Sequence, residues 1–252
     1  MLSQKSVNIE THKAHHPVQN IPAGIFLLFL ELVLSVVIAS MVKLLSNDLN
    51  IFSILFFRYI LSIPLLLLYG FYAHGRNILS INQKGILLLR ISFGLIGLSC
   101  WYLTVIYLTL SVATVLLQTV PIFITVFAPL MTSERVGLRR LSAVIVGFIG
   151  VIILINPNLD GSFAYSGIGL LFGAGATIFG ALMFITLRML GAKNAPTSTA
   201  LWYNFAGAFI FGCLAGFSNG VSTFEIIMGE SLWFLLIFIG ISASLQQYLM
   251  AK

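Results

Sequence analysis

The chain has 252 residues, of which 59% are apolar and only 8% carry a charge. Soluble domains contain roughly 25% charged residues, so a soluble fold of this size could not cover its surface with so few. We therefore expect lipid to cover most of the protein. The formal net charge is +6, but the basic residues lie between apolar runs and not in one patch, which argues against a nucleic-acid partner.

The first 20 residues are polar, and we expect them to form a disordered tail. Three histidines lie in this tail, His12, His15 and His16. No partner ligands follow them at a spacing that metal sites use, so no metal site is predicted. Cys100 and Cys213 lie inside apolar runs, and we interpret them as small packing residues, not as a disulfide pair.

Eight apolar segments follow, each long enough to cross a bilayer, which takes about 20 mostly apolar residues. Polar or turn-rich stretches such as SNDLN and NPNLDGS separate them. The third and fourth segments are joined so tightly that we expect a hairpin. The fold class is therefore predicted to be an all-α integral membrane protein. The predicted transmembrane helices cover residues 21–44, 51–72, 85–107, 110–132, 138–156, 166–188, 198–217 and 231–250.

The charged residues between these segments are distributed very unequally over the two sides of the membrane. The side opposite the N-terminus holds one basic residue, Lys43, together with Asp48, Asp160, Glu225 and Glu230. Cytoplasmic loops of membrane proteins carry the excess of Lys and Arg, so we predict a cytoplasmic N-terminus. The basic residues on the N-terminal side are Lys5, Lys13, Arg76, Lys84, Arg135, Arg139, Arg140, Arg188, Lys193 and Lys252.

The sequence also contains a weak internal repeat. The run GIFLLF that starts at Gly24 resembles GIGLLF, which starts at Gly167, and Tyr59 aligns with Tyr203. A unit of five helices crosses the membrane an odd number of times, so a copy that follows it enters from the opposite side. This is the inverted-repeat design of many secondary transporters. We therefore predict a first unit at 21–157 and an incomplete second unit at 158–252, with eight of an expected ten helices present. A symmetric protein would be roughly 50 residues longer.

The segment 113–157 resembles the fourth and fifth helices of EamA-type carriers in the drug/metabolite transporter superfamily. The family pattern is a small residue, a proline in mid-helix, an ER pair, a basic stretch and GxxGV. The FFRY sequence around Arg58 is similar to the family's second helix. The matching positions in this chain are Ala113, Pro121, Glu134–Arg135, Arg139–Arg140 and Gly147–Val151.

This resemblance implies ten helices in two inverted repeats and transport of a small metabolite across a bacterial inner membrane. Members carry amino acids, nucleosides, riboflavin or S-adenosylmethionine, so the expected partners are a small-molecule substrate, the lipid bilayer and, for coupling, protons. No cofactor is implied. The alternative is a truncated, non-transporting membrane remnant of such a carrier, because the second unit is short.

Three charged residues lie inside predicted helices. Glu31 lies near the middle of the first, where a charge costs roughly 2.5–3.5 kcal/mol on insertion scales. With a rise of about 1.5 Å per residue, the depths of Glu31 and Arg58 in the membrane differ by roughly 6–8 Å. Arg58 is therefore the candidate partner of Glu31. Glu31 either takes up a proton or binds a cationic group of the substrate, or it only neutralises Arg58. Arg58 either holds an anionic group of the substrate, or forms an ion pair with Glu31 or Glu134. Arg90 lies near the cytoplasmic end of its helix, and we expect it to snorkel to that surface.

Polar and aromatic residues on other helices are further candidates for a binding site. Trp101, Tyr102 and Gln118 could line a cavity for a planar or amphipathic solute, or could serve helix packing. In the second unit the polar candidates are Asn204, Gln246 and Gln247.

The structural candidates are prolines, one acid and the glycines of the GxxGV motif. A proline removes a backbone donor and kinks a helix. Glu134 is expected to pair with nearby arginines and to fix the turn into the fifth helix. The complete set is Pro64, Pro121, Glu134, Gly147 and Gly150.

An enzyme is disfavoured by the placement of the reactive side chains. All four histidines fall outside the predicted helices, at positions 12, 15, 16 and 74, and no HExxH motif or intramembrane aspartate pair is present. No catalytic residue is therefore assigned. A channel would need a charged ring or a filter-like run, which the sequence lacks.

Overall fold

The computed structural model describes residues 21–132, 137–155, 165–191, 194–219 and 232–250. Within these ranges every regular element is a helix, which confirms the all-α class. The first part contains α1 (Ile21–Leu45), α2 (Ile51–His74), the short 3-10 helix η1 (Gly75–Leu79), α3 (Lys84–Tyr107), α4 (Leu110–Leu117), α5 (Val120–Thr132) and α6 (Leu138–Ile155). The second part contains α7 (Gly167–Gly191), α8 (Pro196–Asn219) and α10 (Trp233–Met250).

Five stretches of the described chain are long and apolar enough to cross a membrane by length and composition. Their mean hydropathy ranges from 1.4 to 2.2. Large apolar side chains such as Phe209, Phe217 and Leu130 lie exposed on the outside of the bundle, where lipid would cover them. The five stretches are Ile51–Ala73, Lys84–Tyr107, Leu110–Thr132, Gly167–Gly191 and Pro196–Ser218.

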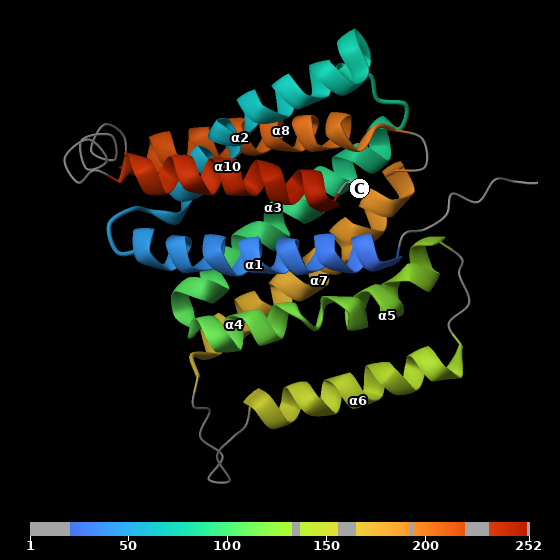
Figure 1. Ribbon diagram of the computed structural model, residues 1–252. Helices are drawn as coiled ribbons and strands as arrows, with labels where there is room; N and C mark the ends of the chain where they lie inside the picture. The colour runs from blue at the N-terminus through green and yellow to red at the C-terminus, as the bar shows by residue number, and fades with distance from the viewer. Residues whose placement is uncertain (1–20, 133–136, 156–164, 192–193, 220–231, 251–252) are drawn as a thin grey trace, which may run out of the picture.

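The helices of the two parts of the chain interleave (Figure 1). α3 packs along α7, and α2 packs along α8. α10 lies against both α1 and α2. α6 lies at the edge of the bundle, next to α5. Helices far apart in sequence therefore enclose a common centre.

Glycines allow the closest of these helix contacts. At Gly97 of α3, an added Cβ would lie 3.1 Å from the backbone nitrogen of Gly180 and 3.2 Å from the carbonyl carbon of Phe179, both in α7. Small residues at such positions bring helix backbones together, which is a main source of packing energy in membranes. Residues Gly169 and Gly173 of α7 face the side chains of Leu108 and Leu116 in the same way.

The fourth predicted helix, 110–132, was expected to kink at Pro121, and the structure divides it into two helices. α4 ends at Leu117, and α5 begins at Val120. Pro121 has no N–H to donate to the carbonyl of Leu117, so the helical hydrogen-bond ladder is interrupted here. Thr119 stabilises the break, because its hydroxyl donates to the Leu116 carbonyl at 2.6 Å.

A pair of tyrosines lies in the core where α2 meets α8. The Tyr59 hydroxyl donates to the Tyr203 hydroxyl at 2.8 Å, and their rings meet edge to face with centroids 5.4 Å apart. Phe211 stacks on the other side of Tyr59 at 5.8 Å. This aromatic core joins the two parts of the chain.

Candidate functional site

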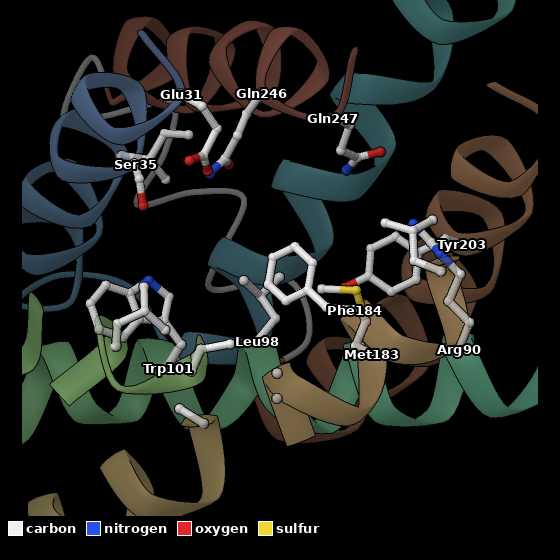
Figure 2. A pocket seen from close by; sticks show the side chains of 18 of the residues that line it. Glu31, Ser35, Arg90, Leu98, Trp101, Met183, Phe184, Tyr203, Gln246 and Gln247 are labelled. Atoms are coloured by element: carbon white, nitrogen blue, oxygen red, sulfur yellow. The ribbon is translucent and has the colours of Figure 1, made fainter. Parts of the chain in front are cut away.

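A cavity of about 350 Å³ lies in the centre of the bundle, within the range of roughly 300–1,000 Å³ that small-molecule sites occupy. Among the described helices, the wall is formed by residues of α1, α2, α3, α4, α5, α7, α8 and α10, and by Gln118 between α4 and α5. Figure 2 shows the side chains that point into it. The wall is formed by Glu31, Leu32, Ser35, Ile38, Arg58, Arg90, Gly94, Gly97, Leu98, Trp101, Tyr102, Leu117, Gln118, Val120, Pro121, Ile124, Ala176, Gly180, Met183, Phe184, Leu187, Pro196, Ala200, Tyr203, Gln246 and Gln247.

Glu31 lines this cavity, but the ion pair expected with Arg58 is not formed. Its carboxylate oxygen Oε1 instead accepts a hydrogen bond from Nε2 of Gln246 at 2.8 Å. The two residues come together because α1 packs against α10, and their side chains meet in Figure 2. Arg58 was the expected partner because of its similar predicted depth, but depth alone does not say which helices are neighbours.

Arg58 also lines the cavity, and it is buried, with 5% of its surface exposed. Its guanidinium carbon lies 5.3 Å from the ring centroid of Tyr59. Its Nε and Nη1 atoms have no hydrogen-bond partner among the described residues. A buried cation with unused donors is a candidate for binding a ligand.

Arg90 was expected to snorkel to the cytoplasmic surface, and this expectation is wrong. Only 6% of the residue is exposed, because α8 covers this part of α3. The guanidinium carbon lies 4.9 Å from the ring centroid of Tyr203, a cation–π distance. Nη1 also makes a long hydrogen bond of 3.5 Å to the Thr199 carbonyl. Arg90 therefore belongs to the cavity wall.

The aromatic and amide candidates of the first part all reach the cavity. Trp101 and Tyr102 are buried in its wall, and the Tyr102 hydroxyl has no hydrogen-bond partner among the described residues. Gln118 lies at the break between α4 and α5 and contributes its exposed side chain.

The amide candidates of the second part divide into two roles. Gln246 and Gln247 line the cavity, whereas Asn204 does not. Asn204 lies behind the wall and donates to Oε1 of Gln247 at 2.6 Å. It therefore orients Gln247 without facing the cavity itself.

The structural candidates also differ from one another. Pro64 lies inside α2, and Pro121 lines the cavity just after the helix break. A side chain at Gly147 would overlap Ile122 of α5, whereas no described atom lies within 4 Å of a Cβ built at Gly150. Glu134 lies outside the described residues.

Several wall residues from the second part were not singled out from the sequence. Met183 and Phe184 of α7 contribute apolar surface, and they resemble ordinary packing residues in the sequence. Tyr203 was noticed only as the repeat partner of Tyr59. In the described residues no three His, Cys, Asp or Glu side chains come together as metal ligands would.

A bundle of membrane-length apolar helices around a cavity with a few buried polar groups is typical of a multi-pass membrane protein with an internal cavity of small-molecule size. The sequence profile of the EamA-like transporter family matches residues 22–156. The chain belongs to this family of transporters, which confirms the resemblance seen in the sequence.

Curated relatives carry different solutes according to their names. The chain is 30% identical to a riboflavin transporter of Vibrio cholerae over 178 residues, covering 70% of this chain and 57% of the relative. It is 30% identical to an S-adenosylmethionine uptake transporter of Rickettsia felis over 137 residues, covering 54% of this chain and 46% of the relative. It is 26% identical to a pseudopaline exporter of Pseudomonas aeruginosa over 231 residues, covering 91% and 78%.

The alignments with the first two relatives span about half the length of each relative. No solved structure matches the chain. The comparisons thus place the chain in a family of membrane-embedded transporters.

Proposed function

We propose that this protein is a secondary transporter that moves a small metabolite across the bacterial inner membrane by alternating access. The central cavity is the solute site. The observation that carries this proposal is the position of the cavity, which lies between the first and second parts of the chain and is walled by helices from both. Alternating access requires a site at such a boundary, so that relative movement of the two parts can open it to either side.

The proposal includes two inverted repeats, at 21–157 and 158–252. Tyr59 and Tyr203 occupy equivalent positions in these repeats, and their hydroxyls touch. Two equivalent residues can meet only near the axis that relates the repeats. The pairing of α1 with α10 also corresponds to that of α7 with α3, because exchanging the repeats turns one pair into the other. The family match at 22–156 coincides with the first unit.

The N-terminus faces the cytoplasm in this proposal, because the basic loops lie on that side. Glu31, Gln246, Arg58, Trp101, Tyr102 and Gln118 contact the solute or its coupling ion, and Asn204 acts through Gln247. Chemistry on the solute is not part of the proposal.

Transport of labelled solutes tests the function directly. The full-length gene product is expressed in a host that lacks its own uptake of riboflavin and S-adenosylmethionine, and accumulation of each labelled compound is measured. We expect accumulation or efflux of at least one labelled metabolite above the empty-vector level. If a wide panel of metabolites, loaded from either side, shows no protein-dependent flux, the carrier function is wrong and a non-transporting remnant becomes the better reading.

Glu31 gives a second test that concerns coupling. A glutamine at this position keeps the size of the side chain but cannot release or take up a proton. We expect Glu31→Gln to reduce transport strongly and to flatten its dependence on pH, because the coupling proton then has no carboxylate to bind. The control is Asp48→Asn, which changes an exposed carboxylate beyond the end of α1. Normal transport by Glu31→Gln at every pH would contradict a coupling role.

A further inference from the structure

One region of the cavity wall carries a surplus of hydrogen-bond donors. Arg58 Nε and Nη1, Arg90 Nε and the Tyr102 hydroxyl are buried and have no hydrogen-bond partner among the described residues. Buried polar groups in native proteins are almost always paired, so each of these groups needs an explanation. We call Arg58, Arg90 and Tyr102 the arginine cluster.

The two arginines belong to one continuous group. Arg58 lies against the ring of Tyr59, and Arg90 lies against the ring of Tyr203. The two tyrosines are joined by their hydroxyl–hydroxyl hydrogen bond of 2.8 Å. The cluster thus places two positive charges around one tyrosine pair, at the meeting point of α2, α3 and α8.

The described part of the chain does not supply the missing acceptor. Its only acidic residues are Glu31 and Asp48. Asp48 is exposed beyond the end of α1, and the groups that act electrostatically on the two arginines are tyrosines. A guanidinium group can only donate hydrogen bonds, and a buried cation without an anion is unfavourable. An oxyanion bound in the cavity would offer acceptors to donors of this kind.

A different chemistry occupies another part of the wall. Glu31 and Gln246 are hydrogen-bonded to each other there, and Figure 2 shows them well away from Arg90 and Tyr203. A carboxylate accepts hydrogen bonds but does not donate them, so its complement is an amine or another donor group. The apolar side chains of Leu98, Met183 and Phe184 lie between the two regions.

We infer that the carried solute is amphoteric, with an oxyanion group bound by the arginine cluster and an amine or similar donor group facing Glu31 and Gln246. This inference rests on the carrier function proposed above and adds the substrate class. The inference distinguishes between the two solutes in the relatives' names, S-adenosylmethionine and riboflavin. S-adenosylmethionine has a carboxylate and an amine, whereas riboflavin has neither a carboxylate nor a phosphate, so the cavity favours the first type.

Two matched pairs of compounds test the oxyanion part. The first pair is S-adenosylmethionine and its decarboxylated form, and the second is riboflavin 5′-phosphate and riboflavin. Binding to the purified full-length protein is measured for each compound by ligand-dependent thermal stabilisation. We expect the member with the oxyanion to bind roughly 10- to 100-fold more tightly in at least one pair, since charged hydrogen bonds contribute that much. The pair that shows the preference distinguishes a carboxylate from a phosphate.

Variants then connect the preference to the cluster. We expect Arg58→Gln and Arg90→Gln each to abolish most of the preference, and Arg58→Lys to retain part of it because the charge remains. Tyr102→Phe, which removes only a hydroxyl, serves as a milder second variant if an arginine variant fails to fold. The matched control is Arg139→Gln at an exposed position of α6, which should behave like the wild type.

The outcomes separate this inference from the carrier function. Equal binding within both pairs, or no binding of any of the four compounds and of inorganic phosphate, would overturn the oxyanion site. An unchanged preference in Arg58→Gln and Arg90→Gln would overturn its assignment to the cluster. Flux that is equally fast with and without the oxyanion group would leave the carrier standing and refute the inference. Tighter binding of the oxyanion member of a pair, without flux of any compound, would support the oxyanion site and refute the carrier function.

Discussion

The hydrogen bond between the hydroxyls of Tyr59 and Tyr203 is one of the buried contacts that join the two parts of the chain. Both residues are buried, and their rings also pack edge to face. Removal of one hydroxyl leaves the ring packing intact but leaves the other hydroxyl without this partner. The substitution of tyrosine by phenylalanine therefore isolates the hydrogen bond.

We expect Tyr59→Phe to lower the free energy of unfolding by about 0.5–1.5 kcal/mol, the range for hydrogen bonds between membrane helices. Reversible unfolding of the purified protein in mixed micelles measures this change. Tyr72→Phe is the control, because Tyr72 is 93% exposed. If the two variants lose the same stability, the buried hydrogen bond does not hold the two parts together.

For single residues, the sequence predicted membership of the cavity wall but not the hydrogen-bond and ring partners. Glu31, Arg58, Trp101 and Gln118 line the cavity, because polar or bulky residues inside apolar helices tend to face a protein interior and not lipid. Their partners could not be deduced. Gln246 lies 215 residues from Glu31 in the sequence, and only the packing of α1 against α10 brings them together. Arg90 was misplaced for the same reason, since Tyr203 is on another helix.

At the level of the helices, the interface between α3 and α7 depends on small residues. Gly97 faces the backbone of α7 and not a side chain that could move aside. We expect Gly97→Ala to push the two helices apart and to lower the free energy of unfolding by about 1–3 kcal/mol, the usual cost of overpacking.

A matched glycine tests whether this effect comes from the interface. Gly150 of α6 has no described atom within 4 Å of an added Cβ, so Gly150→Ala should not lower stability, because alanine is the better helix former. Thermal midpoints of both variants in the same detergent give the comparison. Equal losses in the two variants would mean that the loss at Gly97 does not come from contact with α7.

Most helix ends were predicted well because polar or turn-rich stretches mark them in the sequence. The helix predicted at 51–72 is α2 at Ile51–His74, and that predicted at 138–156 is α6 at Leu138–Ile155. The break between α4 and α5 was not predicted, since Gln118 and Thr119 are only a two-residue polar interruption in a mostly apolar stretch at 110–132. Pro121 pointed to a kink, but the proline alone does not indicate how far the helix will open.

For the whole molecule, the remaining question is which end of the bundle faces the cytoplasm. The loop before α2 carries Asp48, whereas the segment after it carries Arg76 and leads to Lys84 at the start of α3. The rule that basic loops stay inside places Asp48 outside and Lys84 inside. These two exposed residues flank a single helix that is long enough to span the membrane.

Cysteine labelling of Asp48→Cys and Lys84→Cys therefore determines the orientation, in a background where Cys100 and Cys213 are replaced by alanine. We expect a membrane-impermeant maleimide to label Asp48→Cys in intact spheroplasts and Lys84→Cys only after permeabilisation. The opposite pattern would invert the bundle and contradict a cytoplasmic N-terminus. Labelling of both positions in intact spheroplasts would contradict the transmembrane placement of α2. That result would also remove Arg58 from the membrane interior, and with it the reason to expect an oxyanion site there.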